Sequence, residues 1–196
     1  MSPRAADLHL VPVATAADVA TWARIHNLAS PCDPVGHVWL EHKWRQAPQW
    51  EAVLAVRDGR EIGAGQVEVQ HWSPTSCHTD GSIVVPRLER RRGVGSALSA
   101  YLSAWSRRAG RVGMDVWVPE NAPDAPEYWS RRNFAEVGRE ARCRLELATV
   151  TIDPERIVVP DGVMLVTLAG RPDLEAGMYA VGREASMYAA GRSPIL

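Results

Sequence analysis

Alternating and helix-periodic apolar positions divide the first 150 residues into a regular series of strands and helices. Short runs in which apolar and polar residues alternate between turn residues are typical of half-buried strands. Apolar residues three and four positions apart, as from Val19 to Ile25, predict amphipathic helices. We expect the order strand, helix, helix, three strands, helix, strand, helix and two strands. The expected strands are residues 8–13, 50–56, 62–70, 77–85, 112–118, 134–137 and 143–147.

Local signals mark where these elements begin and turn. Thr15 is a good N-cap for the first helix, and residues 36–45 form a second, shorter one. Asp58 and Gly59 predict a tight hairpin turn between two strands. A single crossover helix then separates the fourth and fifth strands. This order predicts an α/β (α+β) fold with a mixed, mostly antiparallel central sheet flanked by helices.

The segment from Ile83 to Leu98 has the pattern of a strand, a glycine-rich turn and a helix. An apolar run ends at Pro86, an arginine-rich turn follows, and Gly93 and Gly95 open a helix-periodic stretch. The first N–H groups of a helix have no intrahelical partner and lie at the positive end of its dipole, so they favour an anion. Glycine admits a ligand close to the backbone, and arginine adds charge-assisted contacts to phosphate. We therefore expect a phosphate-binding loop here.

Two motifs in this part of the chain resemble those of one enzyme family. The spacing Arg90-x-x-Gly93-x-Gly95 resembles the acyl-CoA pyrophosphate loop of the GNAT superfamily of N-acyltransferases, and the series from Asn121 to Phe134 resembles its second signature. The resemblance implies a GNAT acyl-CoA-binding domain over residues 1–150. It implies cofactor contacts from Ile83, Val84, Val85, Arg90, Arg91, Arg92, Gly93, Val94, Gly95, Ser96, Asn121, Ala125 and Trp129.

This resemblance implies an acetyl-CoA-dependent N-acetyltransferase. The acyl group would pass from CoA to a primary amine of a small molecule or protein by direct attack, with acetyl-CoA as the co-substrate. The alternative is a module of the same fold that binds CoA or a partner without turnover. Trp39 and Trp44 in the second helix are interpreted as core or as a lid over it, and contact with the acceptor is the alternative.

Three positions depart from the family pattern. The turn from Pro86 to Gly93 is one residue longer than usual, and Glu89 is the expected insertion. The position of the family's general-acid tyrosine is occupied by Trp129, whose indole cannot protonate a thiolate. Asn133 replaces a glycine, which is a mild change because asparagine tolerates left-handed backbone.

Direct attack needs a group that takes the proton of the amine and can use an acid for the thiolate. Glu68, His78 and Asp80 on the central strands are the base candidates, each with the alternative of a solvated strand residue. Tyr128, beside the substituted tryptophan, is the candidate acid. The residues predicted to act in catalysis are Glu68, Asp80 and Tyr128.

The last 46 residues resemble a second beginning of the same pattern. Residues 8–14 align without gaps on residues 163–169, and Asp18 then falls on Asp173 at the start of both helices. Residues 151–196 are thus interpreted as a connector and the strand and helix that open a second GNAT-like unit, a partial tandem repeat, or as a C-terminal extension. The unpaired strand edges of such a unit would favour a homodimer.

Composition limits the remaining classes of function. A chain that is 46% hydrophobic and 23% charged, with net charge −1, is ordinary for a soluble protein and has no overall bias toward nucleic acid or membrane. The three cysteines are an odd number and include no C-x-x-C pair, and the chain starts without an apolar leader. Both features favour reduced thiols and a cytoplasmic location. The histidine spacings predict no metal site.

Overall fold

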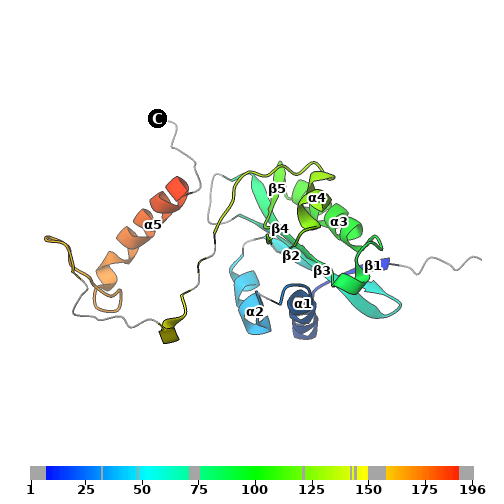
Figure 1. The fold of residues 1–196 in the computed structure, drawn as a ribbon, viewed down its shortest axis with the longest axis horizontal. Helices are drawn as coiled ribbons and strands as arrows, with labels where there is room; N and C mark the ends of the chain where they lie inside the picture. Colours follow the sequence, from blue (N-terminus) through cyan, green and yellow to red (C-terminus); the bar gives the residue numbers. More distant parts are fainter. Residues whose placement is uncertain are drawn as a thin grey trace, which may run out of the picture. The chain divides into compact units, whose positions relative to one another are not determined.

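The structure, a computed structural model, describes residues 8–31, 33–47, 49–70, 76–120, 122–141, 143, 145–149 and 158–189. The chain divides into two compact units, Met1–Pro126 and Glu127–Leu196. Its helices and strands are β1 (Leu8–Pro12), α1 (Ala16–Ala29), α2 (His37–Gln46), β2 (Trp50–Arg57), β3 (Arg60–Val69), β4 (His78–Val84), α3 (Val94–Arg108), β5 (Gly113–Val116), α4 (Ala125–Ser130) and α5 (Glu175–Ala189) (Figure 1).

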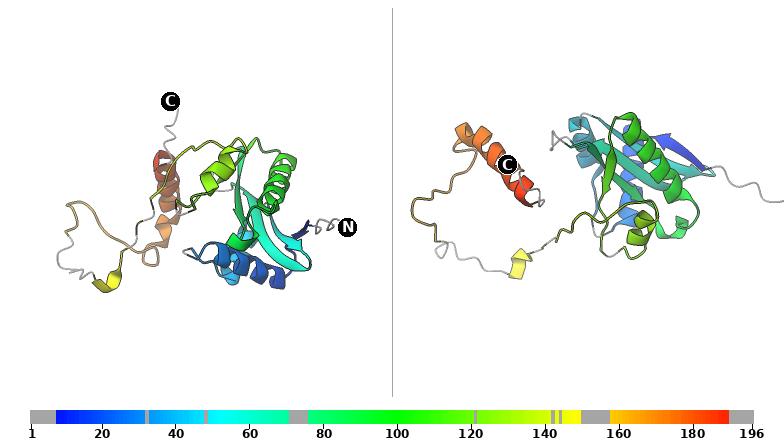
Figure 2. Two further views of the ribbon diagram at one scale, coloured as in Figure 1. Left: turned by 45° about the vertical axis from the view of Figure 1, so that its right-hand side comes forward. Right: turned by 90° about the horizontal axis from the view of Figure 1, so that it is seen from above.

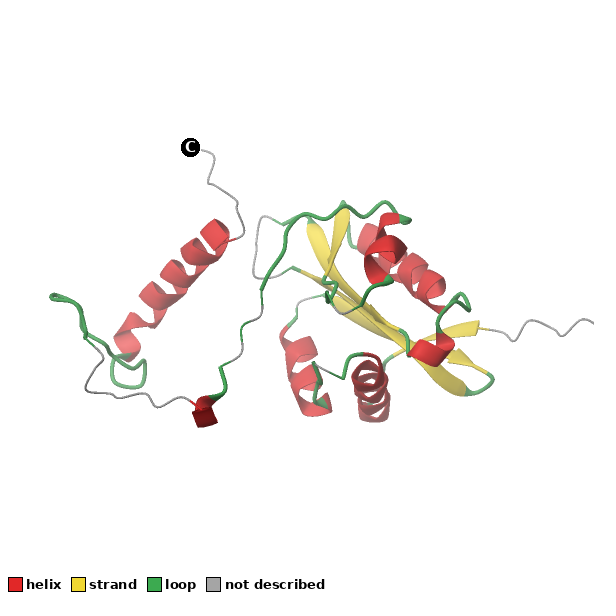
Figure 3. Cartoon of the chain, viewed as in Figure 1, coloured by secondary structure: helices red, strands yellow, loops and turns green. Residues whose placement is uncertain are grey.

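The first unit is a layered sheet with helices on both faces. The five strands lie in the order β1-β2-β3-β4-β5; neighbours are antiparallel except for the parallel pair of β4 and β5. Helices α1 and α2 cover one face and α3 covers the other, as three views agree (Figures 1 and 2). The colouring by element type shows the same layers (Figure 3). The predicted mixed, mostly antiparallel sheet flanked by helices is confirmed.

The local signals act as the sequence predicts. Thr15 caps α1 in a capping box: its Oγ1 accepts the Asp18 N–H at 3.2 Å, and the Asp18 carboxylate accepts the Thr15 N–H at 2.8 Å. Asp58 and Gly59, with φ values of 52° and 71°, form the turn between β2 and β3. Left-handed backbone at both positions matches the twist of the flanking strands.

Three tryptophans hold α1 and α2 on their face of the sheet. Trp22 is 1% exposed and donates its indole N–H to the Gly65 carbonyl at 3.0 Å. Trp44 donates to Oε1 of Gln66 at 3.1 Å and stacks on Trp50 with centroids 4.8 Å apart. Each buried indole therefore has a hydrogen-bond partner on β3, which avoids the cost of an unsatisfied buried donor. Trp44 is confirmed as core, whereas Trp39 is 54% exposed.

Glycines on β3 set how closely α3 approaches the opposite face. Val94, Leu98 and Leu102 of α3 are at most 1% exposed and pack over this strand. A Cβ added at Gly63 would lie 2.7 Å from Cγ1 of Val94, and one at Gly65 would lie 3.4 Å from Cδ1 of Leu102. The small residues thus let α3, the helix that follows the predicted phosphate loop, lie directly on the sheet.

The second unit departs from the sequence prediction after α4. Residues 134–141, 143, 145 and 146 lie in loops, so the strands predicted at 134–137 and 143–147 are wrong. Phe134 turns back onto Trp129, with ring centroids 4.7 Å apart, after Asn133 adopts a φ of 64°. A strand needs a neighbour for its backbone groups, and within the described residues these segments have none.

Of the strand and helix predicted to open a second GNAT-like unit, only the helix is present. Residues 163–169 are loop and turn with mostly exposed side chains, so the strand expected there is wrong. The helix expected after it is present as α5, which follows a 3-10 turn at Pro172–Leu174. The strand edge behind the expected homodimer is therefore missing, and a tandem repeat stays a hypothesis. The predicted domain boundary at residue 150, and the part of the predicted connector (residues 153–162) that runs up to residue 157, lie outside the described residues.

Candidate active site

The backbone of the predicted phosphate loop has the conformation of an anion site. Gly93 caps α3 with a φ of 83°, and Arg91 before it has a φ of 63°. Helix α3 begins at Val94, so the N–H groups of its first turn, in the stretch of Val94, Gly95 and Ser96, lie at the positive end of the helix dipole. A Cβ added at Gly93 would meet nothing within 4 Å, so the space beside it is open.

Glu89, the expected insertion, lies in a short helical turn. Arg87–Glu89 is a 3-10 helix in which the Glu89 N–H donates to the Pro86 carbonyl at 2.8 Å. The Glu89 carboxylate lies 3.2 Å from Nη1 of Arg92. The longer turn is therefore an ordered one that also supplies a partner for an arginine of the loop.

The arginines of the loop are exposed but paired. Nε of Arg90 donates to the Val85 carbonyl at 3.0 Å, which is one of the backbone groups expected to face the cofactor. Arg91 lies 4.0 Å from Asp124. The Arg92 carbonyl accepts a hydrogen bond from Nη2 of Arg57 at 2.9 Å. Exposed pairs of this kind are weak, so they orient the arginines without fixing them.

Strands β4 and β5 are paired only over part of β4. Their parallel register runs from His78 opposite Gly113 to Gly81 opposite Val116. The rest of β4, through Val84, continues beside β3. On the β5 side, the residues predicted to contact the cofactor, Ile83 and Val84, thus have no strand neighbour within the described residues.

A polar network lies on the face of the sheet that α1 and α2 cover. Nε2 of Gln70 donates to Oδ1 of Asp80 at 2.8 Å and to Oδ2 of Asp115 at 2.9 Å. Asp80 and Asp115 are opposite each other in the register of β4 and β5. Nδ1 of His78 lies 3.1 Å from Oδ1 of Asp115. Two of the base candidates, His78 and Asp80, are thereby brought into one network.

The pKa of Asp80 is raised to about 6, chiefly by burial. The neighbouring carboxylates Asp115 and Glu68 raise it further, whereas the Gln70 hydrogen bond and the Lys43 ammonium lower it. A carboxylate with this pKa is ionised at neutral pH and accepts a proton more readily than an ordinary aspartate.

Glu68, the third base candidate, is engaged in a buried ion pair. It is 5% exposed, and its Oε1 lies 2.7 Å from Nζ of Lys43 on α2. Its Oε2 has no hydrogen-bond partner in the described part of the chain. Glu68 lies opposite Asp80 in the register of β3 and β4. It therefore acts on Asp80 through its charge, and its own carboxylate is already paired.

Alternation predicted the polar face of β3, but the roles of three residues that complete the network were not predicted. Alternation places Glu68 and Gln70 on one face, yet it does not show that Gln70 joins β4 to β5. Asp115 alternates with apolar neighbours in its strand, which was the available signal. Lys43 reaches Glu68 only because α2 packs on the sheet, and no sequence pattern predicts that contact.

The second predicted signature, residues 121–134, lies mostly outside the first unit, Met1–Pro126. Asn121 is outside the described residues, and Ala125 is the first residue of α4. In the second unit, Trp129 is 8% exposed and packs edge-on to Tyr128 with centroids 5.0 Å apart. The Arg132 guanidinium lies 3.7 Å from the centroid of the Tyr128 ring. The roles of Tyr128 and Trp129 remain predictions.

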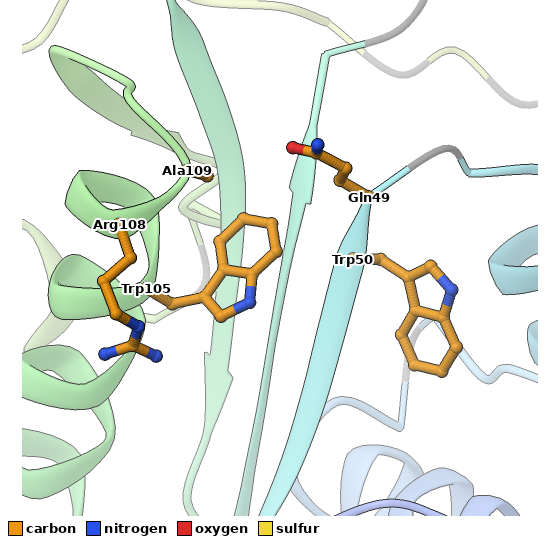
Figure 4. A pocket seen from close by; sticks show the side chains of 5 residues that line it. All are labelled: Gln49, Trp50, Trp105, Arg108 and Ala109. Atoms are coloured by element: carbon orange, nitrogen blue, oxygen red, sulfur yellow. The ribbon is translucent and has the colours of Figure 1, made fainter.

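An open depression of about 350 Å³ lies elsewhere, at the carboxyl end of α3. Trp105 and Arg108 come from α3, and Trp50 comes from the start of β2 (Figure 4). Its lining is Gln49, Trp50, Trp105, Arg108 and Ala109. None of these is a predicted site residue, and the opposite end of α3 carries the phosphate loop.

Two further findings concern other kinds of site. Within the described ranges, no group of three or more histidine, cysteine, aspartate or glutamate residues is placed to hold a metal ion. The described helices are all too short or too polar to span a membrane.

Comparison with known proteins gives a family and a fold. The model of the acetyltransferase (GNAT) family matches residues 22–134. No curated protein matches the sequence. Among solved structures, the aminoglycoside N-acetyltransferase AAC(6')-Iy in complex with CoA is 20% identical, with a TM-score of 0.59, over 74% of this chain and 99% of its own.

Two other structures show the same similarity. The aminoglycoside 6'-N-acetyltransferase AAC(6')-Ih from Acinetobacter baumannii is 15% identical, with a TM-score of 0.55, over 71% of this chain and 99% of its own. The ribosomal-protein-alanine N-acetyltransferase from Brucella melitensis is 17% identical, with a TM-score of 0.55, over 71% of this chain and all (100%) of its own. At these identities the likeness shows a shared fold.

Proposed function

This chain belongs to the acetyltransferase (GNAT) family, and on that premise we propose that it transfers an acetyl group from acetyl-CoA to a primary amine, with Asp80 as the general base. The predicted class, an acyltransferase, is confirmed by the family match. The acceptor and the residues that act on it are the proposal. The observation that carries it is a half-buried carboxyl, with a pKa of about 6, beside the point where β4 and β5 part.

The phosphate loop fits the cofactor. Backbone N–H groups at the start of α3 suit a pyrophosphate, and the open space at Gly93 leaves room for it. Within the described residues, Ile83 and Val84 of β4 and Val85 just after it have no strand neighbour on the β5 side, which suits a cofactor arm that pairs with backbone amides. Arg90 would release the Val85 carbonyl as it turns to phosphate, since the pair is exposed.

The reaction then needs one proton acceptor and one proton donor. The amine nitrogen attacks the thioester carbonyl carbon, the carbon–sulfur bond breaks, and the amine loses a proton to Asp80. Glu68 and Asp115 keep that carboxyl basic. Tyr128 is the proposed donor to the CoA thiolate, because it is the phenol next to Trp129, which occupies the family's general-acid position. A backbone N–H near Val85 is the proposed oxyanion donor.

The acceptor is an amine, and assays with a panel of candidate amines should determine its chemical class. Aminoglycosides and a peptide with a free amino terminus belong in that panel, because the names of two enzymes of similar fold give an aminoglycoside and a ribosomal-protein alanine as their acceptors. An acidic end of the site, with Asp80 and Asp115, suits a cationic amine.

The test is acetyl-CoA-dependent release of thiol with the amine panel, in the unaltered chain and in Asp80→Asn. We expect turnover in the first and a loss of about 100-fold or more in the second. Glu61→Gln, which removes an exposed carboxylate elsewhere on β3, is the matched control and should keep full activity. Turnover unchanged in Asp80→Asn would reject this base. Binding of acetyl-CoA without turnover on any amine would favour the non-catalytic module.

A further inference from the structure

Among the described residues, Gln70 is the one side chain that hydrogen-bonds to the carboxyl groups of both Asp80 and Asp115. Its amide nitrogen donates one hydrogen to Asp80 at 2.8 Å and one to Asp115 at 2.9 Å. We propose that Gln70 is the positioning residue of the acceptor end: it fixes the carboxyl of Asp80 by one oxygen and so leaves the other oxygen for the amine. This inference rests on the proposed function of Asp80 as the base.

The direction of the Gln70 amide is determined by its other contact. The Ser76 hydroxyl donates to Oε1 of Gln70, and the same hydroxyl oxygen accepts the His78 N–H at 3.1 Å. A hydroxyl has one hydrogen to donate, and an ionised carboxylate can only accept. The amide oxygen must therefore face Ser76, and the amide NH₂ must face the two aspartates.

Ser76 is itself anchored, so the amide is held at both ends. Its carbonyl accepts a hydrogen bond from Nη1 of Arg111 at 3.1 Å. Gln70 is 7% exposed, which leaves its side chain little freedom to turn. A chain of contacts thus runs from Arg111 through Ser76 to Gln70 and ends on the proposed base. Such support keeps a catalytic group within the narrow geometry that attack requires.

The charges around Asp80 make this support necessary. Glu68 on β3 and Asp115 on β5 repel its ionised form, while Lys43 on α2 attracts it. On β4 itself, His78 contacts Asp115. Two carboxylates side by side would separate or share a proton if no donor joined them. Gln70 supplies one hydrogen to each and carries no charge, so both can stay ionised without a bound cation.

Removing the amide should change Asp80 in two measurable ways. In Gln70→Leu, which keeps the size of the side chain, turnover should fall by about 10- to 100-fold as the carboxyl loses its fixed geometry. The acid limb of the pH profile of kcat/KM should move upward by roughly one pH unit, because a hydrogen bond to the ionised form is lost. KM for acetyl-CoA should not change, since Gln70 hydrogen-bonds to the proposed base and is not among the residues expected to contact the cofactor.

The control is Gln66→Leu, which removes an amide from β3, the strand that ends just before Gln70. Oε1 of Gln66 accepts a hydrogen bond from Trp44, and within the described residues Gln66 has no hydrogen bond to either aspartate. It should leave the acid limb in place. Ser76→Ala keeps Gln70 but releases its oxygen, so it should shift the limb in the same direction by less. Thermal unfolding of each variant checks that it folds.

The carboxyl carbon of Asp80, followed by ¹³C NMR titration and assigned through Asp80→Asn, gives a second readout that needs no turnover. An upward shift of its midpoint in Gln70→Leu but not in Gln66→Leu supports the positioning role, even if Asp80→Asn retains activity and the proposed base is wrong. A midpoint in folded Gln70→Leu equal to that of the unaltered chain overturns it. If Gln70→Leu does not fold, the same comparison between Ser76→Ala and Gln66→Leu decides.

Discussion

The ammonium of Lys43 lies 2.7 Å from Oε1 of Glu68, and this pair joins α2 to the centre of the sheet. The side chain of Glu68 is 7% exposed and that of Lys43 is 27% exposed. Breaking such a pair from one side leaves a buried charge without a partner, which is the costly way to lose it.

We expect Lys43→Met to lower the free energy of unfolding by about 1–3 kcal/mol, less than a fully buried pair would cost because the lysine is partly in water. Urea denaturation measures it. The double variant Lys43→Met with Glu68→Gln should recover part of the loss. Arg24→Met, which breaks the exposed Arg24–Glu61 pair at 3.3 Å, is the control and should cost under about 1 kcal/mol. Equal losses in the two single variants would contradict this account.

The raised pKa of Asp80 predicts a pH dependence of stability. Its pKa in the fold is about 6, above its ordinary 3.8, so between these values the native state binds more protons than the unfolded chain. Stability from this group is therefore full below about pH 4 and falls as pH rises to about 6. The fall should be about 1–2 kcal/mol, allowing for partial exposure, and Asp80→Asn should abolish it. A parallel pH dependence in both proteins would refute it.

Gly63 should be the least replaceable glycine of β3. An alanine there would place its Cβ 2.7 Å from Val94, so α3 must move, at a cost of about 1–3 kcal/mol. Gly65→Ala, on the same face, meets its nearest atoms at 3.4 Å, an ordinary contact, and should cost less. Thermal unfolding of the two variants compares them. The order of the two costs, more than their size, is the test.

Gly93→Ala separates backbone strain from cofactor binding when it is compared with Gly59→Ala. Both glycines have left-handed backbone, at φ 83° and 71°, and neither would meet an atom within 4 Å, so each alanine should cost about 1–2 kcal/mol of stability. Only Gly93 caps the phosphate loop. Calorimetry should show weaker acetyl-CoA binding in Gly93→Ala and unchanged binding in Gly59→Ala. Equal affinity in the two would place the cofactor elsewhere.

Sequence patterns predicted the parts of this fold that depend on neighbours close along the chain. The cap at Thr15, the turn at Asp58 and Gly59, and the glycine start of α3 are local, and all form as expected. The strand expected at 134–137 fails because a strand also needs a partner, which no local pattern contains. The network around Asp80 was likewise predicted only in part. Asp115 was missed because the parallel register that brings it beside Asp80 is set by the crossover through α3.

Lys43 has a chemical significance beyond its contact with Glu68. It is the single lysine of the chain; the other basic side chains are arginines and histidines. Guanidinium groups keep their protons and so are poor nucleophiles toward thioesters. The one side-chain amine that an acyl donor could modify is thus engaged in an ion pair with a buried carboxylate 2.7 Å away. A protein that handles activated acyl groups carries its own amine in a protected form.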